Sequence, residues 1–161
     1  MRWIVDGYNF IRQVDFLSAA EANGLQAGRE ALLDFLTEYR QHRPKDLFTV
    51  VFDGREEFAS QFNRGAEGIQ VIFSRRERGE TADDAIKKML ETLSNPAETT
   101  VVSADRDIIR FARTLRFPTL SPLDFCRPPV PGRRAAAGKP TLSEQHQQQI
   151  EKELRRDLGL G

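Results

Sequence analysis

The sequence has few of the residues that build disulfides and histidine-based sites. Its 161 residues include one cysteine, Cys126, and two histidines, His42 and His146. A single cysteine excludes an internal disulfide and is typical of a reducing compartment, so we expect the protein in the cytoplasm. Two histidines in separate polar stretches do not make the cluster that a zinc site or a histidine base requires.

Long apolar segments and two common catalytic motifs are also missing. No apolar run approaches the roughly 18 residues of a membrane helix, so we expect no membrane partner. The strand-like residues 3–5 follow the first residue closely, so we expect no signal peptide. The sequence contains neither a Gly-x-x-x-x-Gly-Lys loop nor a Gly-x-Ser-x-Gly elbow, which excludes these two routes to phosphate binding and acyl transfer.

The charge is balanced overall but unevenly distributed. The whole chain has a net charge of zero, with 39% hydrophobic and 30% charged residues, as in an ordinary soluble globular protein. Residues 1–126 carry 17 Lys and Arg against 20 Asp and Glu, whereas residues 127–161 carry 7 against 4. A basic tail suits a nucleic-acid partner and equally suits plain solubility, so charge alone does not decide the function.

Hydrophobic periodicity predicts strands that mostly alternate with helices. We expect strands over residues 3–5, 47–52, 69–73, 99–102 and 117–120, and helices over 26–42, 81–93 and from about 106 to 116. Residues 55–68 are polar and lack a clear period, so we expect a loop there. Alternation of this kind predicts an α/β fold with right-handed crossovers, a mostly parallel sheet and helices on both faces.

The composition changes after Cys126 and predicts a separate tail. We expect one domain over residues 1–126, a linker rich in Pro, Gly and Arg over 127–140, and a helix over 141–161. The helix begins with the capping-box pattern Thr141-Leu142-Ser143-Glu144. Its apolar residues form a narrow stripe that is too small to fold alone, so we expect the helix to dock or to mediate a homodimer.

Aspartates follow three of the predicted strands. Asp6, Asp53 and Asp105 each come just after a strand, and the carboxyl ends of parallel strands meet at the edge where open α/β sheets bind ligands. A fourth acid lies in the first turn of the helix beginning near Thr81. At 100° per residue, Asp83 falls near the border of the apolar face, and we expect it at the site. Asp84 points away and occupies the acidic position of a capping box.

Each of these aspartates has an ordinary structural explanation when taken singly. Aspartate is a common turn residue, and in a first helical turn it complements the helix dipole. Taken together, carboxylates at one edge repel each other unless a cation neutralises them. A hard cation with oxygen ligands, Mg²⁺ or Mn²⁺, does this best, and such a metal can activate water and stabilise a phosphodiester under in-line attack.

Four motifs in order resemble those of the NYN domain, and more closely its YacP-like branch, which is related to the PIN nucleases. They are Val5-Asp6-Gly7-Tyr8-Asn9, Val50-Val51-Phe52-Asp53-Gly54, Glu80-Thr81-Ala82-Asp83-Asp84 and Ser103-Ala104-Asp105-Arg106-Asp107. The resemblance covers residues 2 to about 126. It implies a three-layer α/β/α, PIN-like fold and an endoribonuclease that uses Mg²⁺ or Mn²⁺. For the YacP-like branch it further implies messenger RNA as the substrate and a connection with the ribosome.

The resemblance also assigns roles to residues. It implies that Asp6, Asp83 and Asp105 are metal ligands and that Asp53 completes the acidic pocket. Asn9 either hydrogen-bonds a metal-bound water or substrate phosphate, or caps a helix beginning at Phe10.

The motif that follows the fourth strand adds two further expectations. We expect Asp107 to support the metal site without binding the metal directly. The alternative is that its charge only complements the dipole at the N-terminus of the helix. For Ser103 we favour helix capping over a phosphate contact.

An arginine stripe offers a path for RNA. Arg106, Arg110 and Arg113 recur at helical spacing beside Asp105, with Arg116 at the margin, and can hold phosphates. Further positive and aromatic side chains occur in the neighbouring loops, namely Arg55, Arg64, Arg75, Arg76, Arg78, Phe58 and Phe62. The alternative for each arginine is a solvated position on a helix or loop.

Three functions compete on these residues. The first is a metal-dependent endoribonuclease, and the second is a non-catalytic RNA- or ribosome-binding module on the same fold. The third is a phosphotransferase or phosphatase with Asp53 as nucleophile, and it is disfavoured because Arg55 stands where such enzymes place a second acid. The presence of all the expected acids favours the nuclease.

Overall fold

The computed structural model describes residues 1–54, 67–74 and 78–127 of the chain. The chain divides into two compact units, Met1–Cys126 and Arg127–Gly161, and every element below belongs to the first. The linker and helix expected beyond Arg127 lie outside the described residues and stay predictions. Among the described helices, none has the length and apolar character that a membrane span needs.

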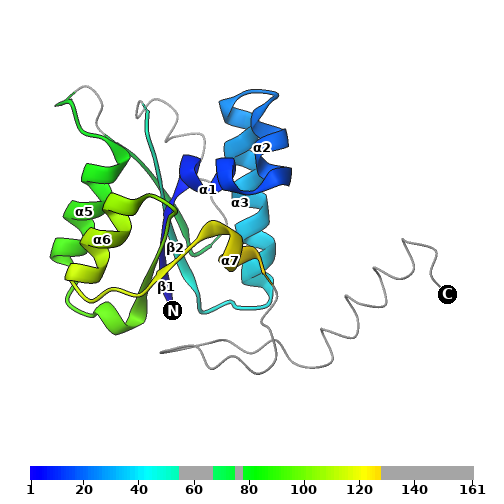
Figure 1. Cartoon of the computed structure of the whole chain (residues 1–161). Helices are drawn as coiled ribbons and strands as arrows, with labels where there is room; N and C mark the ends of the chain where they lie inside the picture. The colour runs from blue at the N-terminus through cyan, green and yellow to red at the C-terminus, as the bar shows by residue number, and fades with distance from the viewer. Residues whose placement is uncertain (55–66, 75–77, 128–161) are drawn as a thin grey trace. The chain divides into compact units, whose positions relative to one another are not determined.

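The first unit is organised around a parallel sheet of five strands in the order β3-β2-β1-β4-β5 (Figure 1). The strands are β1 (Arg2–Asp6), β2 (Leu47–Phe52), β3 (Ile69–Phe73), β4 (Thr99–Val102) and β5 (Thr119–Leu120). Every neighbouring pair is parallel, which confirms the predicted α/β class. β5 is shorter than the predicted 117–120, because Pro118 has no N–H to donate to a ladder.

Four helices pack on one face of the sheet: α1 (Gly7–Gln13), α2 (Asp15–Glu21), α3 (Leu25–Gln41) and α7 (Pro122–Cys126). Their buried core is aromatic, and Phe125 of α7 lies 5.1 Å from Trp3 between ring centroids. Helix α3 was predicted as 26–42. Helices α2 and α7 were not predicted, and α1 was raised only as a helix beginning at Phe10, because stretches of five to seven residues are too short to show a helical period.

Helices α5 (Ala82–Thr92) and α6 (Arg106–Thr114) cover the opposite face, so the unit has three layers (Figure 1). Ile86 and Leu90 of α5 pack with Ile4 and Val51 of the sheet. Both helices match the predicted ranges within two residues. Helix α6 ends before Arg116, which takes a φ of 65°, a left-handed conformation that stops a helix.

The order of the strands determines where a ligand crevice opens. From β1 the chain moves outward through β2 to β3, and it then crosses back to place β4 on the other side of β1. The strand order therefore reverses between β1 and β4. Open α/β sheets bind their ligands at the carboxyl ends of strands beside such a reversal.

Candidate active site

Asp6 is the last residue of β1, and its side chain is buried at this reversal with 7% of its surface exposed. The chain turns directly from β1 into α1 at Gly7. A Cβ at Gly7 would overlap the ring of Phe52, so only glycine allows the helix to start this close to the neighbouring strand. This close turn explains why Asp-Gly follows the strand and why the Asp6 carboxyl stays buried.

Ser103 connects Asp6 with the loop that carries Asp105. Its fully buried hydroxyl donates to Asp6 Oδ2 at 3.1 Å and accepts from the Asp105 backbone N–H at 3.0 Å. Asp105 Oδ1 in turn accepts from the backbone N–H groups of Asp107 and Ile108 at the start of α6. The N-cap of α6 is therefore Asp105, and Ser103 bridges two carboxylate-bearing segments instead of capping the helix as we had favoured.

Asn9 fastens α1 to the same loop. Its Oδ1 accepts from the Ala104 backbone N–H at 2.7 Å. The expected alternative, that Asn9 caps a helix beginning at Phe10, is wrong because α1 begins at Gly7 and Asn9 lies inside its first turn. Asn9 thus fixes the distance between Asp6 and the segment Ser103-Ala104-Asp105, and its contact with substrate or a metal-bound water stays a prediction.

Asp53 and Asp83 lie on the β2–β3 side of the edge. Asp53 Oδ1 accepts from the Ala82 backbone N–H at 2.7 Å and from the Ser74 hydroxyl at 3.1 Å. These bonds join the ends of β2 and β3 to the first turn of α5, where Asp83 is half-buried.

Asp84 forms the capping box with Thr81 that the sequence predicted. The Asp84 N–H donates to the Thr81 hydroxyl at 3.2 Å, and the Thr81 N–H donates to Asp84 Oδ2 at 3.0 Å. The bonds that Asp84 Oδ2 accepts from the Thr81 N–H and from the Thr81 hydroxyl lower the pKa of the Asp84 carboxyl below its usual value. Asp84 therefore forms its hydrogen bonds within the helix start, while its neighbour Asp83 faces the acidic edge. By the acidic edge we mean the carboxyl end of the sheet with Asp6, Asp53, Asp83 and Asp105.

The electrostatics show that the carboxylates act on one another. Burial raises the pKa of Asp6 from 3.8 to about 6; the Ser103 hydrogen bond opposes this shift, while the Asp83 and Asp105 carboxylates add to it. Burial also raises the pKa of Asp83, followed by repulsion from Asp105 and, against the pull of Lys87, from Asp53. A cluster with these shifts is a candidate functional site, because bound protons or cations relieve repulsion among carboxylates.

The donor set suits Mg²⁺ or Mn²⁺ in its chemistry, since every acid at this edge offers carboxylate oxygen. Within the described ranges, no three carboxylate, imidazole or thiol groups stand close enough together to hold an ion as the side chains are placed. The edge therefore has suitable donors that require side-chain movement before they could converge on one cation. His42 ends α3 at the amino ends of the strands, and His146 lies outside the described residues.

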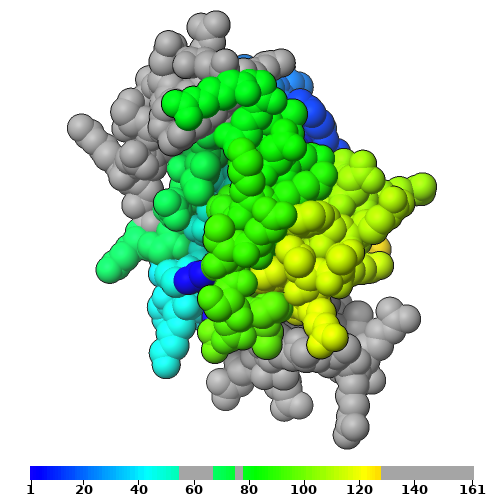
Figure 2. Space-filling view, turned by 90° about the vertical axis from the view of Figure 1, so that its left-hand side faces the viewer, coloured from blue at the N-terminus to red at the C-terminus, as the bar shows by residue number. Residues whose placement is uncertain are grey.

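The predicted RNA-binding arginines are exposed along α6, on the molecular face that Figure 2 shows together with α5. Arg106, Arg110 and Arg113 all reach solvent, and Arg113 Nε donates to Thr119 Oγ1 at 3.3 Å. Asp107 is exposed at the second position of α6. Of the further basic and aromatic candidates, Arg116 and Arg78 are exposed, and the others lie outside the described residues: Arg55, Phe58, Phe62, Arg64, Arg75 and Arg76.

Sequence reasoning missed Ser74 and the partnership of Tyr8 with Arg29. Arg29 of α3 is buried, its Nη1 donates to the Tyr8 hydroxyl at 3.0 Å, and its guanidinium lies over the Phe73 ring. Ser74 follows β3 directly, as Asp53 follows β2 and Ser103 follows β4. A polar residue immediately after a third strand was the signal that could have found it.

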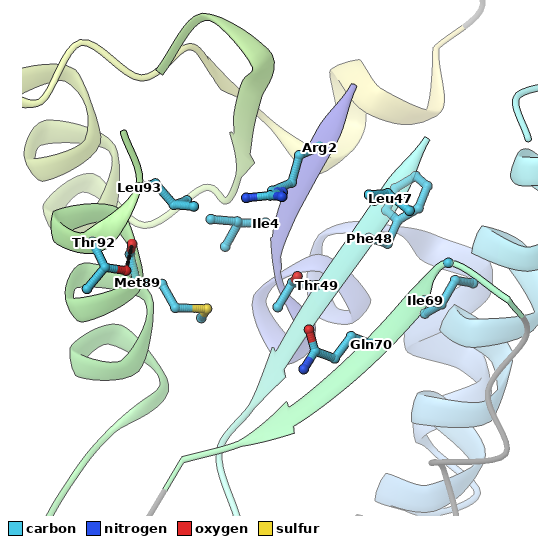
Figure 3. A pocket seen from close by; sticks show the side chains of 11 residues that line it. Arg2, Ile4, Leu47, Phe48, Thr49, Ile69, Gln70, Met89, Thr92 and Leu93 are labelled. Atoms are coloured by element: carbon cyan, nitrogen blue, oxygen red, sulfur yellow. Dashed lines mark hydrogen bonds between the residues drawn. The ribbon is translucent and has the colours of Figure 1, made fainter. Parts of the chain in front are cut away.

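A cavity of about 440 Å³ lies at the other end of the sheet (Figure 3). Its lining comes from the amino-terminal parts of β1, β2 and β3 and from the last turn of α5, including Ile4, Thr49, Gln70 and Met89. Figure 3 shows these side chains between α5 and the strands. None of the expected site residues lines this cavity, so the acidic edge remains the candidate site.

Known proteins resemble this chain in sequence and in fold. The chain is 31% identical to the protein YacP of Bacillus subtilis (strain 168) over 94 residues, which span 58% of this chain and 54% of that protein. Two crystal structures of Rae1 (YacP) from Bacillus subtilis, one of them a point variant, share the fold. They have TM-scores of 0.66 and 0.64 and 23% identity, and the match covers 100% and 99% of this chain and 85% and 82% of theirs.

A family model covers nearly the whole chain. The model of the YacP-like NYN domain matches residues 3–156, which include all four motifs and therefore all four aspartates of the acidic edge. The resemblance seen in the motifs is thereby confirmed. The chain belongs to the YacP-like NYN domain family, a family of PIN-like nucleases.

Proposed function

We propose that this protein is a divalent-metal-dependent endoribonuclease in which Asp6, Asp83 and Asp105 hold the metal. The observation that carries the proposal is the convergence of these carboxylates: Ser103 links buried Asp6 to the Asp105 backbone, and Asp83 lies close enough to add to the raised pKa of Asp6. Family membership supplies the class of reaction, and the all-oxygen donor set favours Mg²⁺ or Mn²⁺ over zinc.

The chain's own residues prepare the edge for this reaction. A divalent cation bound there would supply charge stabilisation of the phosphodiester and an activated water for in-line attack. Ser103 and Asn9 hold the Asp105 loop against Asp6, which limits how far the carboxylates can separate. Burial of Asp6 excludes water around it and strengthens its electrostatic interactions.

RNA would reach the edge along α6. Arg106 begins this helix beside Asp105, and Arg110 and Arg113 continue outward along its exposed surface. These guanidinium groups would bind phosphates without reading sequence. We further propose that the substrate is messenger RNA bound to the ribosome. Membership of the YacP-like branch alone supports this part of the proposal.

The first experiment incubates the purified full chain with an end-labelled RNA pool and either Mn²⁺ or Mg²⁺. The test variant combines Asp6→Asn with Asp83→Asn, and the matched control combines Asp34→Asn with Glu38→Gln, which changes the charge equally on the exposed surface of α3. We expect internal cleavage by the wild type and the control, loss of cleavage in the test variant, and full inhibition by EDTA.

The other possible outcomes distinguish the nuclease from a non-catalytic RNA-binding module. RNA binding by the wild type without cleavage, on free RNA and on translating ribosomes, would replace the enzyme with a non-catalytic RNA-binding module. Cleavage on ribosomes alone would instead support a nuclease that needs the ribosome. Cleavage that survives in the double variant would contradict the assignment of the site.

A further inference from the structure

Asp53 differs from the other acids in what its carboxylate contacts. One oxygen, Oδ1, accepts both from the Ala82 backbone N–H at 2.7 Å and from the Ser74 hydroxyl at 3.1 Å. Both donors are buried, with exposures of 3% for Ala82 and 2% for Ser74. Ala82 is 29 residues away along the chain. These contacts tie three separate elements, β2, β3 and α5, to one carboxylate.

The first turn of α5 needs this carboxylate from outside the helix. The first four N–H groups of any helix lack partners within it, and a buried N–H left unpaired destabilises the fold because it has lost its hydrogen bond to water. Thr81 satisfies the Asp84 N–H through the capping box. The capping box does not reach Ala82, whose N–H is satisfied by Asp53.

The capping box and Asp53 therefore do different things. Thr81 and Asp84 belong to the same turn, so their hydrogen bonds set the shape of the helix start without attaching it to the sheet. The apolar residues Ile86 and Leu90 attach the later turns by packing, which is not directional. The bond from Ala82 to Asp53 is the directional link beside Asp83.

The electrostatic neighbours place Asp53 at the margin of the cluster. The carboxylates that raise the pKa of Asp6 are those of Asp83 and Asp105. Asp53 acts on Asp83, and its own side chain is exposed. Asp53 contacts the backbone of the turn that carries Asp83.

We infer that Asp53 is a positioning residue, which holds the first turn of α5 against the ends of β2 and β3 and thereby places Asp83 opposite Asp6. This inference rests on the proposed function and assigns the fourth acid a role other than that of a metal ligand. It replaces the expectation from the resemblance that Asp53 itself completes the catalytic acids.

The substitution Asp53→Asn separates the two roles because asparagine keeps Oδ1 as an acceptor and removes the charge. We expect Asp53→Asn to retain at least about a third of the cleavage rate and to bind Mn²⁺ within about threefold of the wild type. Asp53→Ala removes the acceptor, so we expect it to lose about 100-fold in rate, the scale of a 1 Å displacement of a reacting group. Asp83→Asn, which removes a proposed ligand, is the reference for a full loss.

A second readout does not depend on activity. Amide hydrogen exchange reports the local stability of the helix start. We expect exchange at Ala82 and Asp83 to be at least about tenfold faster in Asp53→Ala than in the wild type, and unchanged within about threefold in Asp53→Asn. Ser74→Ala removes the second donor only, and we expect a smaller acceleration in the same direction.

Two results would overturn the inference. The first is that Asp53→Asn loses cleavage and Mn²⁺ affinity as fully as Asp83→Asn with normal amide exchange, which would make Asp53 a ligand. The second is that Asp53→Ala leaves exchange at Ala82 unchanged. If the wild type neither binds Mn²⁺ nor cleaves RNA, the proposed function fails, while amide exchange still decides whether Asp53 holds α5.

Discussion

The two sides of the acidic edge are built differently. On the inner side, Asp6 and Asp105 are connected through the buried hydroxyl of Ser103, and we call these two acids the inner pair. On the outer side, Asp53 is exposed and Asp83 half-buried, and their connection runs through the helix backbone at Ala82; we call them the outer pair. Asp6 of the inner pair is buried, which raises its pKa, whereas the outer pair is tied to the start of α5 through the Ala82 N–H. Burial therefore raises the proton affinity of Asp6 on one side, and a hydrogen-bonded helix start positions Asp83 on the other.

The largest expected effect comes from removing charge at the centre of the inner pair. Asp6→Asn should lower cleavage at least about 100-fold, because a proposed ligand disappears and the hydrogen bond from the Ser103 hydroxyl loses its charged acceptor. Single-turnover cleavage of a labelled RNA in Mn²⁺ measures this. The control Asp34→Asn removes an exposed carboxylate on α3 and should leave the rate within about twofold. A rate for Asp6→Asn close to that of the control would contradict the central role of Asp6.

Substitutions of Ser103 and Ser74 test the difference between the inner and the outer pair, because each serine donates to one acid of its pair. Ser103→Ala leaves the Asp105 N–H without its partner and removes the donor to Asp6, so we expect a loss of stability of about 1–3 kcal/mol and roughly tenfold in cleavage. Ser74→Ala leaves Asp53 its stronger partner, the Ala82 N–H, so its effects should be several times smaller. Urea unfolding and cleavage assays on both variants test this order, and equal effects would show that the two sides do not differ.

The raised pKa of Asp6 predicts how the stability of the metal-free protein depends on pH. The folded state binds the proton at a pKa of about 6 and the unfolded state near 3.8, so folding is favoured as pH falls between these values and this contribution is lost as pH rises above 6. Relative to Asp6→Asn, the wild type in EDTA should gain about 1 kcal/mol between pH 7 and pH 5. Denaturant unfolding at both pH values measures the difference. Parallel curves for the two proteins would refute the burial of a titrating Asp6.

The smallest expected effect lies on the α6 surface outside both pairs. Arg110→Gln should weaken RNA binding about two- to fivefold at low salt, with a shallower dependence of affinity on salt, because one phosphate contact is lost. Arg2→Gln is the matched control, since Arg2 is exposed at the amino end of β1, opposite the acidic edge. Filter binding across a salt series measures both variants. Equal weakening by the two would show that RNA does not follow α6.

Much of the fold could be predicted because long apolar patterns specify elements. The strand over 47–52 and the helices over 26–42 and 81–93 carry clear periods, and the structure confirms them. Helices α2 and α7 were missed, and α1 was expected only as one alternative beginning at Phe10. Tertiary packing stabilises these short helices, as Phe125 shows by contacting rings from β1, α1 and α3. Short elements of this kind have too few residues for a pattern to emerge.

The expected acids reached one edge for a reason visible in the sequence, namely that each follows a parallel strand or begins the next helix. The partners of those acids were not visible. Asn9 was assigned either to a helix cap or to the substrate, and it binds the Ala104 N–H across 95 residues. Contacts over such separations depend on strand order, which alternation of strands and helices leaves open.

The sequence by itself determined the class of the fold, the family and the set of acids, because periodicity and local motifs are properties of neighbouring residues. Only the tertiary structure decided how each acid is held: Asp6 by burial beside Ser103, and Asp83 through a helix start fastened to Asp53. The physical reason is that hydrogen bonds and burial act through space. Strand order brings Ser103 beside Asp6 and Ser74 beside Asp53, and no local pattern encodes that order.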